Sequence, residues 1–209
     1  MKAFIFDMDG VIINSEPLHF AVEAELAKEN GIILKEGELE SYVGTRADEM
    51  WSSLKAAHQA DFDVDTLLKE ANEKKLAYLH DANMEPIDGI RELLEQLKEK
   101  GYKIGLGSSS TVAFIDAVLT AFSIKDQFDV VLSGEQVAKG KPAPDIYLAV
   151  ADRLGVSPQN CTVLEDAAHG VQAGKEAGMT VIGYVNPYSG NQDLSKADLR
   201  IEDIAAITI

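Results

Sequence analysis

Residues 3–10 read AFIFDMDG, an unbroken apolar run that ends on two carboxylates and a glycine. Four consecutive apolar residues are typical of a short parallel strand that is buried on both faces. Asp7 and Asp9 should project from the carboxyl end of this strand into one crevice, and Gly10 allows the backbone to turn tightly there. Because charges interrupt the apolar run so early, we expect neither a signal peptide nor a membrane span.

From about residue 88 onward, strand and helix patterns alternate along the sequence. Strands are expected over residues 102–106, 128–132, 161–164 and 180–185, and helices over residues 90–97, 111–122, 144–154 and 167–177. This alternation predicts an α/β fold whose core is a doubly wound, Rossmann-like parallel sheet.

The segment between about residues 14 and 86 departs from this alternation and shows only helical stripes of apolar residues. We therefore expect a small all-helical cap domain that is inserted after strand one, over the sheet edge where ligands bind in such folds. The predicted core comprises residues 1–14 and 87–209, and the predicted cap comprises residues 15–86. Ser15 fits the N-cap position of the first cap helix.

The amino-acid composition argues against some classes of binding partner. Of the 209 residues, 46% are hydrophobic and 26% are charged, and the formal net charge is −16. A chain this acidic repels phosphate backbones and anionic membranes, so we expect neither nucleic acid nor a membrane as a partner. One cysteine, Cys161, permits no internal disulfide and fits a reducing compartment. The expected location is the cytoplasm.

Three further polar motifs lie near the ends of expected strands. They are Gly107-Ser108-Ser109-Ser110, the loop around Lys141, and Glu165-Asp166. Each alone has a plainer explanation, namely serine helix caps, a solvated loop lysine, and acids that favour a helix N-terminus. Together with Asp7 and Asp9 at one sheet edge, they predict a phosphoryl-transfer site with a nucleophile, an anion cradle, a charge clamp and a divalent cation such as Mg²⁺.

Four stretches together resemble the four motifs of the haloacid-dehalogenase-like hydrolase superfamily, and most closely its β-phosphoglucomutase-like branch, which includes sugar-phosphate phosphatases. They are DMDGVIINSEPLH, GLGSSS, GKPAPDIY and VLEDAAHGVQAGKEAGM. The resemblance spans nearly the whole chain, including the helical cap, and it implies chemistry at phosphorus through an aspartyl-phosphate.

The resemblance also implies a role for each matching residue. Asp7 matches the nucleophile and Asp9 the general acid/base. Ser108 matches the hydroxyl that binds the phosphoryl oxygens, with the backbone of Ser109 beside it, and Lys141 matches the charge-clamping lysine. The implied Mg²⁺ ligands are Asp166 with Glu165, alongside Asp7 and the backbone carbonyl of Asp9. Asn14 departs from the pattern, because many relatives carry an acid there.

The resemblance extends to substrate-binding residues of the cap. His19 matches a histidine of the resembling mutases, and Arg46 could clamp a second anionic or hydroxyl-rich part of the substrate. Lys75 lies on the same helical face as Leu68, Ala71 and Leu79, so we expect it to point toward the core domain. The plainer alternatives are that Lys75 only covers apolar surface and that Arg46 pairs with Glu49 on its own helix.

Two activities fit this site. The first is a Mg²⁺-dependent phosphatase that acts on a small phosphorylated metabolite, expected to be a sugar phosphate. The alternative is a β-phosphoglucomutase, an isomerase that uses the same aspartyl-phosphate. A signalling receiver domain also combines acids, a hydroxyl and a lysine around Mg²⁺, but it would not need a helical insertion of about seventy residues. Relatives of this size and cap type suggest a monomer.

Overall fold

A six-stranded parallel sheet forms the centre of the protein. The computed structural model describes residues 1–81 and 84–209. The strands lie in the order β3-β2-β1-β4-β5-β6, and every neighbouring pair is parallel. They are β1 (Ala3–Phe6), β2 (Lys103–Ser108), β3 (Val130–Ser133), β4 (Cys161–Glu165), β5 (Thr180–Tyr184) and β6 (Leu199–Ile201). The first five confirm the expected strands. The sixth was not predicted, because three largely exposed residues at a sheet edge carry no apolar pattern.

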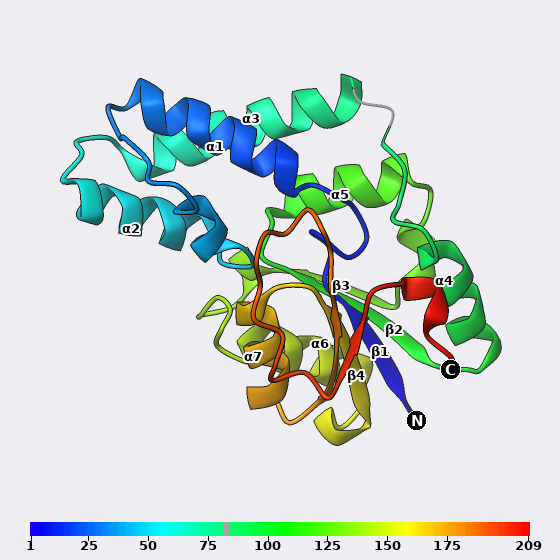
Figure 1. The fold of residues 1–209 in the computed structure, drawn as a ribbon. Coiled ribbons are helices and arrows are strands. Elements are labelled where there is room, and N and C mark those ends of the chain that lie inside the picture. Colours follow the sequence, from blue (N-terminus) through cyan, green and yellow to red (C-terminus); the bar gives the residue numbers. More distant parts are fainter. Residues whose placement is uncertain (82–83) are drawn as a thin grey trace.

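Helices cover both faces of the sheet, as a doubly wound fold requires (Figure 1). Successive side chains of a strand point to opposite faces. Phe4 and Phe6 of β1 accordingly join one buried cluster, and Ala3 and Ile5 join the other. The first cluster includes residues of α4 (Ile90–Glu99) and α5 (Val112–Ala121), and the second includes residues of α6 (Asp145–Leu154) and α7 (Ala168–Glu176).

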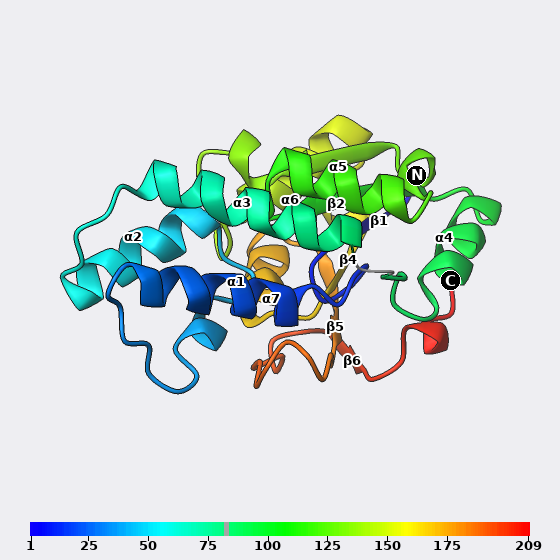
Figure 2. The ribbon, with the colours of Figure 1, turned by 90° about the horizontal axis from the view of Figure 1, so that it is seen from above.

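Three helices between β1 and α4 form the helical cap. They are α1 (Glu16–Glu29), α2 (Ala47–His58) and α3 (Val64–Asp81). Figure 1 shows them above the sheet, and Figures 1 and 2 both show α1 and α3 side by side. Short 3₁₀ turns lie at Leu39–Tyr42, Lys125–Gln127, Gly134–Gln136, Pro158–Asn160 and Ile204–Ala206. Across the described residues, none of the helices has the length and apolar character that a transmembrane span requires.

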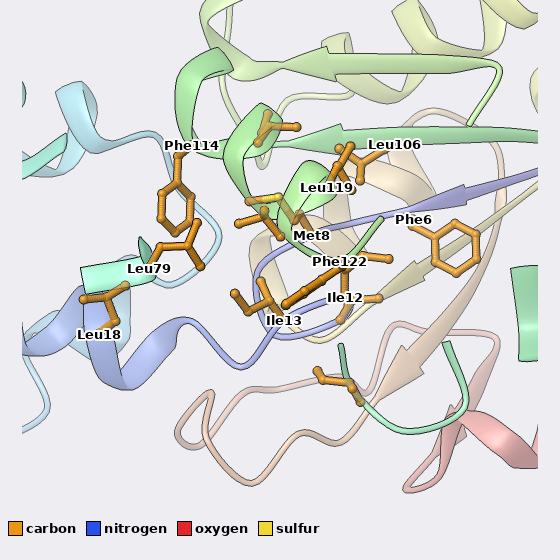
Figure 3. Close-up of a cluster of buried hydrophobic side chains, with 14 of the residues drawn as sticks. Phe6, Met8, Ile12, Ile13, Leu18, Leu79, Leu106, Phe114, Leu119 and Phe122 are labelled. Carbon is orange, nitrogen blue, oxygen red and sulfur yellow. The ribbon is translucent and has the colours of Figure 1, made fainter. Parts of the chain in front are cut away.

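One hydrophobic cluster runs from the sheet into the cap (Figure 3). Phe6 and Leu106 contribute to it from the sheet, Phe114 from α5, and Leu18 and Leu79 from the cap helices α1 and α3. Burial of these side chains stabilises the cap against the core, because removal of apolar surface from water is the dominant favourable contribution to packing. The cap is thereby held over the carboxyl ends of the strands. The division between cap and core at residues 14/15 and 86/87 stays a prediction.

Candidate active site at the carboxyl edge of the sheet

Asp7 and Asp9 leave β1 at the sheet edge and both line a pocket between core and cap. The backbone amide of Asp7 still donates to the carbonyl of Leu164 at 3.0 Å, so the sheet itself holds this residue in place. Gly10 then turns the chain with φ +76°, and a Cβ there would lie 1.9 Å from Oδ2 of Asp166. Glycine is therefore required at this position for both backbone conformation and space.

Lys141 is buried between two carboxylates. Its Nζ donates to Oδ1 of Asp7 and to Oε1 of Glu165, each at 2.6 Å. The hydroxyl of Tyr147 donates to the same Glu165 oxygen at 2.5 Å, and the backbone amides of the next two residues donate to Oε2 at 3.1 Å. Burial alone would lower the pKa of Lys141, but the two carboxylates raise it above its usual value, so the ammonium stays charged. Glu165 thus positions a fixed positive charge beside Asp7.

Asp166 completes a buried acidic cluster that fits a divalent cation. Ligand oxygens of Asp7, Glu165 and Asp166 lie within 4.8 Å of one another. Oδ2 of Asp166 accepts a hydrogen bond from Ser189, whereas its buried Oδ1 has no hydrogen-bond partner. Burial, followed by the charges of Glu165 and Asp7, raises the pKa of Asp166 well above its usual value. An unpartnered, buried carboxylate oxygen beside two other acids is a ligand set of the kind that Mg²⁺ prefers.

The acidic cluster also affects Asp7 itself. Burial raises the pKa of Asp7 to about 8, a value that Lys141 moderates and that Glu165 and Asp9 increase. Since a bound cation favours the ionised form of its ligands, occupation of the cluster would return Asp7 to the carboxylate form at neutral pH. Of the three acids, Glu165 already accepts hydrogen bonds at both oxygens, so Asp7 and Asp166 are the better-placed ligands.

Four side chains surround the carboxylate of Asp9. Ser15 and His19 contact Oδ1 at 2.6 and 2.9 Å, and Ser108 and Ser110 donate to Oδ2 at 3.1 and 2.8 Å. Burial alone would raise the pKa of Asp9, but the contacts with His19, Ser15 and Ser110 outweigh it and lower the pKa below its usual value. Ser15 does occupy the N-cap position of α1, but its side chain makes no capping bond and binds Asp9 instead.

The residues predicted from the cap lie in two different places. His19 and Lys75 line the pocket, and Lys75 Nζ donates to Oε1 of Glu23 at 2.8 Å. Arg46 is not among the described pocket-lining residues. Its guanidinium donates from Nε to Oδ1 of Asp48 at 2.9 Å and from NH1 to the carbonyl of Val137 at 3.4 Å. Arg46 therefore lies where the cap meets the core loop that precedes Lys141.

Two further sequence predictions have specific partners in the structure. Glu49, considered as a partner for Arg46, instead accepts a hydrogen bond from the amide of Gly140 at 3.3 Å. Ser109 lines the pocket, and its hydroxyl donates to the carbonyl of Gly44 in the cap at 2.8 Å. Both contacts join cap to core, which the sequence pattern did not indicate.

Several residues of the site were missed by sequence reasoning. Ser110 and Tyr147 stand within quoted motifs and could have been included on that ground, whereas Asn186 and Ser189 lie in a loop without a motif. Asn186 Nδ2 donates to the carbonyl of Gly10 at 2.7 Å and to Oδ1 of Asn14 at 2.8 Å, so this loop braces the turn after β1. Only the folded chain brings that loop to the site.

Comparisons with known proteins agree with this geometry. The sequence profile of the family described as "Haloacid dehalogenase-like hydrolase" matches residues 4–184. Hexitol phosphatase B of Escherichia coli (strain K12) is 32% identical over 99% of this chain and 94% of its own. β-Phosphoglucomutase of Bacillus subtilis (strain 168) is 34% identical over 100% of this chain and 92% of its own.

The fold comparison leads to the same family. A crystal structure of β-phosphoglucomutase from Clostridium difficile superposes with a TM-score of 0.89 and 30% identity, covering 100% of this chain and 93% of that one. The matched region includes the strand that carries Asp7, the helical cap and the strand that carries Glu165. The chain therefore belongs to the haloacid dehalogenase-like hydrolase family and is an enzyme of that family.

Proposed function

We propose that this enzyme is a Mg²⁺-dependent phosphatase that hydrolyses a small sugar phosphate through an aspartyl-phosphate on Asp7. The observation that carries the proposal is the buried contact of Asp7 with Lys141, beside Asp166 and next to the pocket that Asp7 and Asp9 line. Phosphoryl transfer requires a nucleophile, a fixed cation, a carboxylate pair that can bind a metal, and a second acid. The sugar-phosphate substrate is supported by relatives whose names specify phosphorylated carbohydrates.

In the first step, a carboxylate oxygen of Asp7 attacks phosphorus and the bond between phosphorus and the sugar oxygen breaks. Lys141, held 2.6 Å from Oδ1 of Asp7, places positive charge where two anions must approach each other. The hydroxyl of Ser108, the last residue of β2, and the backbone amide of Ser109 after it would donate hydrogen bonds to the phosphoryl oxygens. Asp9 gives its proton to the departing sugar oxygen.

Asp9 then acts as the base of the second step. It takes a proton from water as the water oxygen attacks phosphorus, and the bond between phosphorus and Asp7 breaks to release phosphate. Without substrate, His19, Ser15 and Ser110 hold the pKa of Asp9 low. A phosphoryl group that enters beside Asp9 brings negative charge and competes for the serine hydroxyls, so it would raise the pKa of Asp9 and allow it to carry the proton.

Asp7 and Asp166, with Glu165 beside them, would hold Mg²⁺. The chemistry that the ion supplies when bound is positive charge, which offsets the repulsion between a carboxylate and a phosphate dianion. Because the enzyme itself has a net charge of −16, a phosphate dianion needs this local positive charge in order to approach Asp7.

A β-phosphoglucomutase activity is the second candidate, and the 34% identity to a named β-phosphoglucomutase favours it. A mutase would use the same covalent step but return the phosphoryl group to another sugar hydroxyl. It therefore needs a cap that excludes water and accepts both ends of a sugar bisphosphate. The two activities differ only in whether water or sugar attacks the phosphorylated Asp7.

The deciding experiment measures hydrolysis and isomerisation in the same reaction. Purified enzyme with Mg²⁺ is incubated with a panel of hexose and hexitol phosphates and with β-glucose 1-phosphate, and both inorganic phosphate and glucose 6-phosphate are followed. Phosphate release that requires Asp7 and Mg²⁺ supports the phosphatase. Isomerisation of β-glucose 1-phosphate faster than its hydrolysis would replace the phosphatase with the mutase. The monomeric state and the cytoplasmic location stay predictions, and sedimentation velocity tests the first.

A further inference from the structure

The cap wall of the pocket is acidic. Glu16 and Glu23 line it from α1, and Lys75 lines it from α3. Lys75 is the sole lysine or arginine among the described residues that line this pocket. Its Nζ donates to Oε1 of Glu23 at 2.8 Å, and the two side chains are 12% and 9% exposed, so the pair is shielded from bulk water. The cation on this wall is therefore already neutralised.

The electrostatics of Glu16 agree with this geometry. Burial, followed by the negative charges of Asp9 and Glu23, raises the pKa of Glu16 well above its usual value, and Lys75 offsets this only in part. A second anionic group on a ligand would meet the same burial and the same negative charges of Asp9 and Glu23. A like charge close to those carboxylates is disfavoured. A sugar hydroxyl has no such penalty and can donate hydrogen bonds to the carboxylates.

The remaining cationic residues near the pocket are occupied elsewhere. Arg46 binds Asp48 and the carbonyl of Val137 outside the lining. Lys141 is bonded to Asp7 and Glu165 at the phosphoryl end. Among the described residues that line the pocket, no lysine or arginine other than the paired Lys75 is thus available for a second phosphate or a carboxylate at the cap end.

We infer that Glu23, by neutralising Lys75 beside Glu16, makes the cap wall select phosphate monoesters whose alcohol part is uncharged and rich in hydroxyls, and reject those with a second anionic group. The inference rests on the proposed phosphatase function and specifies its substrate class. It also disfavours a bisphosphate ligand, which the mutase alternative needs.

The test uses two substrates that differ in one group. Glucitol 6-phosphate ends in a hydroxymethyl group where 6-phosphogluconate ends in a carboxylate. We expect kcat/KM of the native enzyme to be at least about tenfold higher for the uncharged member of the pair. A ratio near one would overturn the inference without any variant being needed.

The Glu23→Gln variant should release the Lys75 ammonium into the pocket. We expect this variant to improve kcat/KM for 6-phosphogluconate, chiefly through a lower KM, and to reduce the ratio by about tenfold. The double variant with Lys75→Met should lose that gain. An unchanged ratio in the Glu23→Gln variant would contradict the role assigned to the pair.

The chain supplies a matched control. Glu25 of α1 binds Lys74 of α3 at 2.7 Å, and Lys74 also lies 3.7 Å from Glu29. The Glu25→Gln variant therefore removes one glutamate charge from the same two helices, and none of these three residues lines the pocket. The substrate ratio should stay unchanged in this variant, and an equal fall in both glutamate variants would overturn the inference.

Failure of the inference and failure of the proposed function are distinguishable. Hydrolysis of p-nitrophenyl phosphate tests the phosphatase without any sugar hydroxyl. If that hydrolysis requires Asp7 while glucitol 6-phosphate and 6-phosphogluconate are hydrolysed with the same kcat/KM, the substrate class is wrong and the phosphatase stands. If no phosphate ester is hydrolysed, both are wrong.

Discussion

The two ends of the candidate active-site pocket differ in what holds their side chains in place. At the core end, Asp7 and Lys141 are buried, and each lies within hydrogen-bond distance of its partners, at 2.6 Å. At the cap end, Lys75 faces the pocket whereas Arg46, also predicted to bind substrate, faces the core loop. A strand end fixes the direction of the side chains that follow it, but the rotation of a cap helix is set by packing. The positions of the residues proposed for the reaction are therefore fixed more tightly than those of the residues proposed to select the substrate.

The largest expected effect comes from the core end. The Asp7→Asn variant should lose at least about a thousandfold in kcat, because an amide oxygen cannot replace the carboxylate as the nucleophile. Phosphate release from a sugar phosphate with Mg²⁺ is the measurement, and an unchanged circular dichroism spectrum is the control. Turnover at the native rate would exclude the aspartyl-phosphate and remove the distinction between the two ends.

The Lys141→Met variant should be the next most severe. It leaves the buried carboxylates of Asp7 and Glu165 without their cation, which should lower the free energy of unfolding by about 3–5 kcal/mol and kcat by roughly a hundredfold. Urea unfolding in the presence of a chelator measures the first effect, and added Mg²⁺ should restore part of it. A stable variant with normal kcat would show that the contact is incidental.

The Tyr147→Phe variant tests whether the hydrogen bond from Tyr147 to Glu165 helps to position Lys141 at the core end. It removes one donor to Oε1 of Glu165 and keeps the ring in the core, so we expect a fall of about three- to tenfold in kcat with little change in KM. A change confined to KM would mean that Tyr147 acts on substrate binding rather than on the Glu165–Lys141 contact.

The Ser15→Ala variant tests the junction where the cap begins. Ser15 is one of the donors that lower the pKa of Asp9, so its contribution to stability is present above the ordinary value of 3.8 and declines as the pH falls below it. The variant should be less stable by about 1–2 kcal/mol at pH 7, and the difference should persist to about pH 3.8 and shrink only at lower pH, where Asp9 of the folded variant takes up a proton. A difference that is independent of pH would show that Ser15 does not act through the ionised form of Asp9.

The smallest effect should come from Arg46→Ala at the cap end. Its guanidinium forms a partly exposed ion pair with Asp48, and such pairs contribute about 0–1 kcal/mol. KM for a sugar phosphate should therefore change by less than about threefold, with Mg²⁺ binding intact. A tenfold increase in KM would mean that Arg46 turns into the pocket when substrate binds, as the family resemblance implies.

The core of the fold could be predicted from the sequence because its signals are local. The run from Ala3 to Phe6 is apolar at every position, and the structure shows it buried on both faces. Helical stripes such as Ile90, Leu93, Leu94 and Leu97 are likewise buried on one side of α4. β6 was missed because an exposed edge strand needs only backbone pairing, which leaves no trace in the side-chain pattern.

The candidate site could be predicted in part. Asp7, Asp9, Lys141, Glu165 and Asp166 each stand near a strand end, and the parallel sheet brings all of those ends to one edge. The positions of Glu16 and Glu23 relative to Lys75 could not be predicted, because the contact joins residues 52 positions apart through the packing of α1 against α3.

What the sequence alone determined is the succession along the chain of the five buried strands and their helices, and the polar motifs at or near the ends of these strands, since both follow from neighbouring residues. Only the tertiary structure decided that Ser15 binds Asp9 instead of capping its helix, that the loop with Ser189 reaches Asp166, and that Arg46 faces away from the pocket. The physical reason is that these contacts depend on the packing of cap against core, and helical periodicity specifies which residues are buried but not which partner they meet.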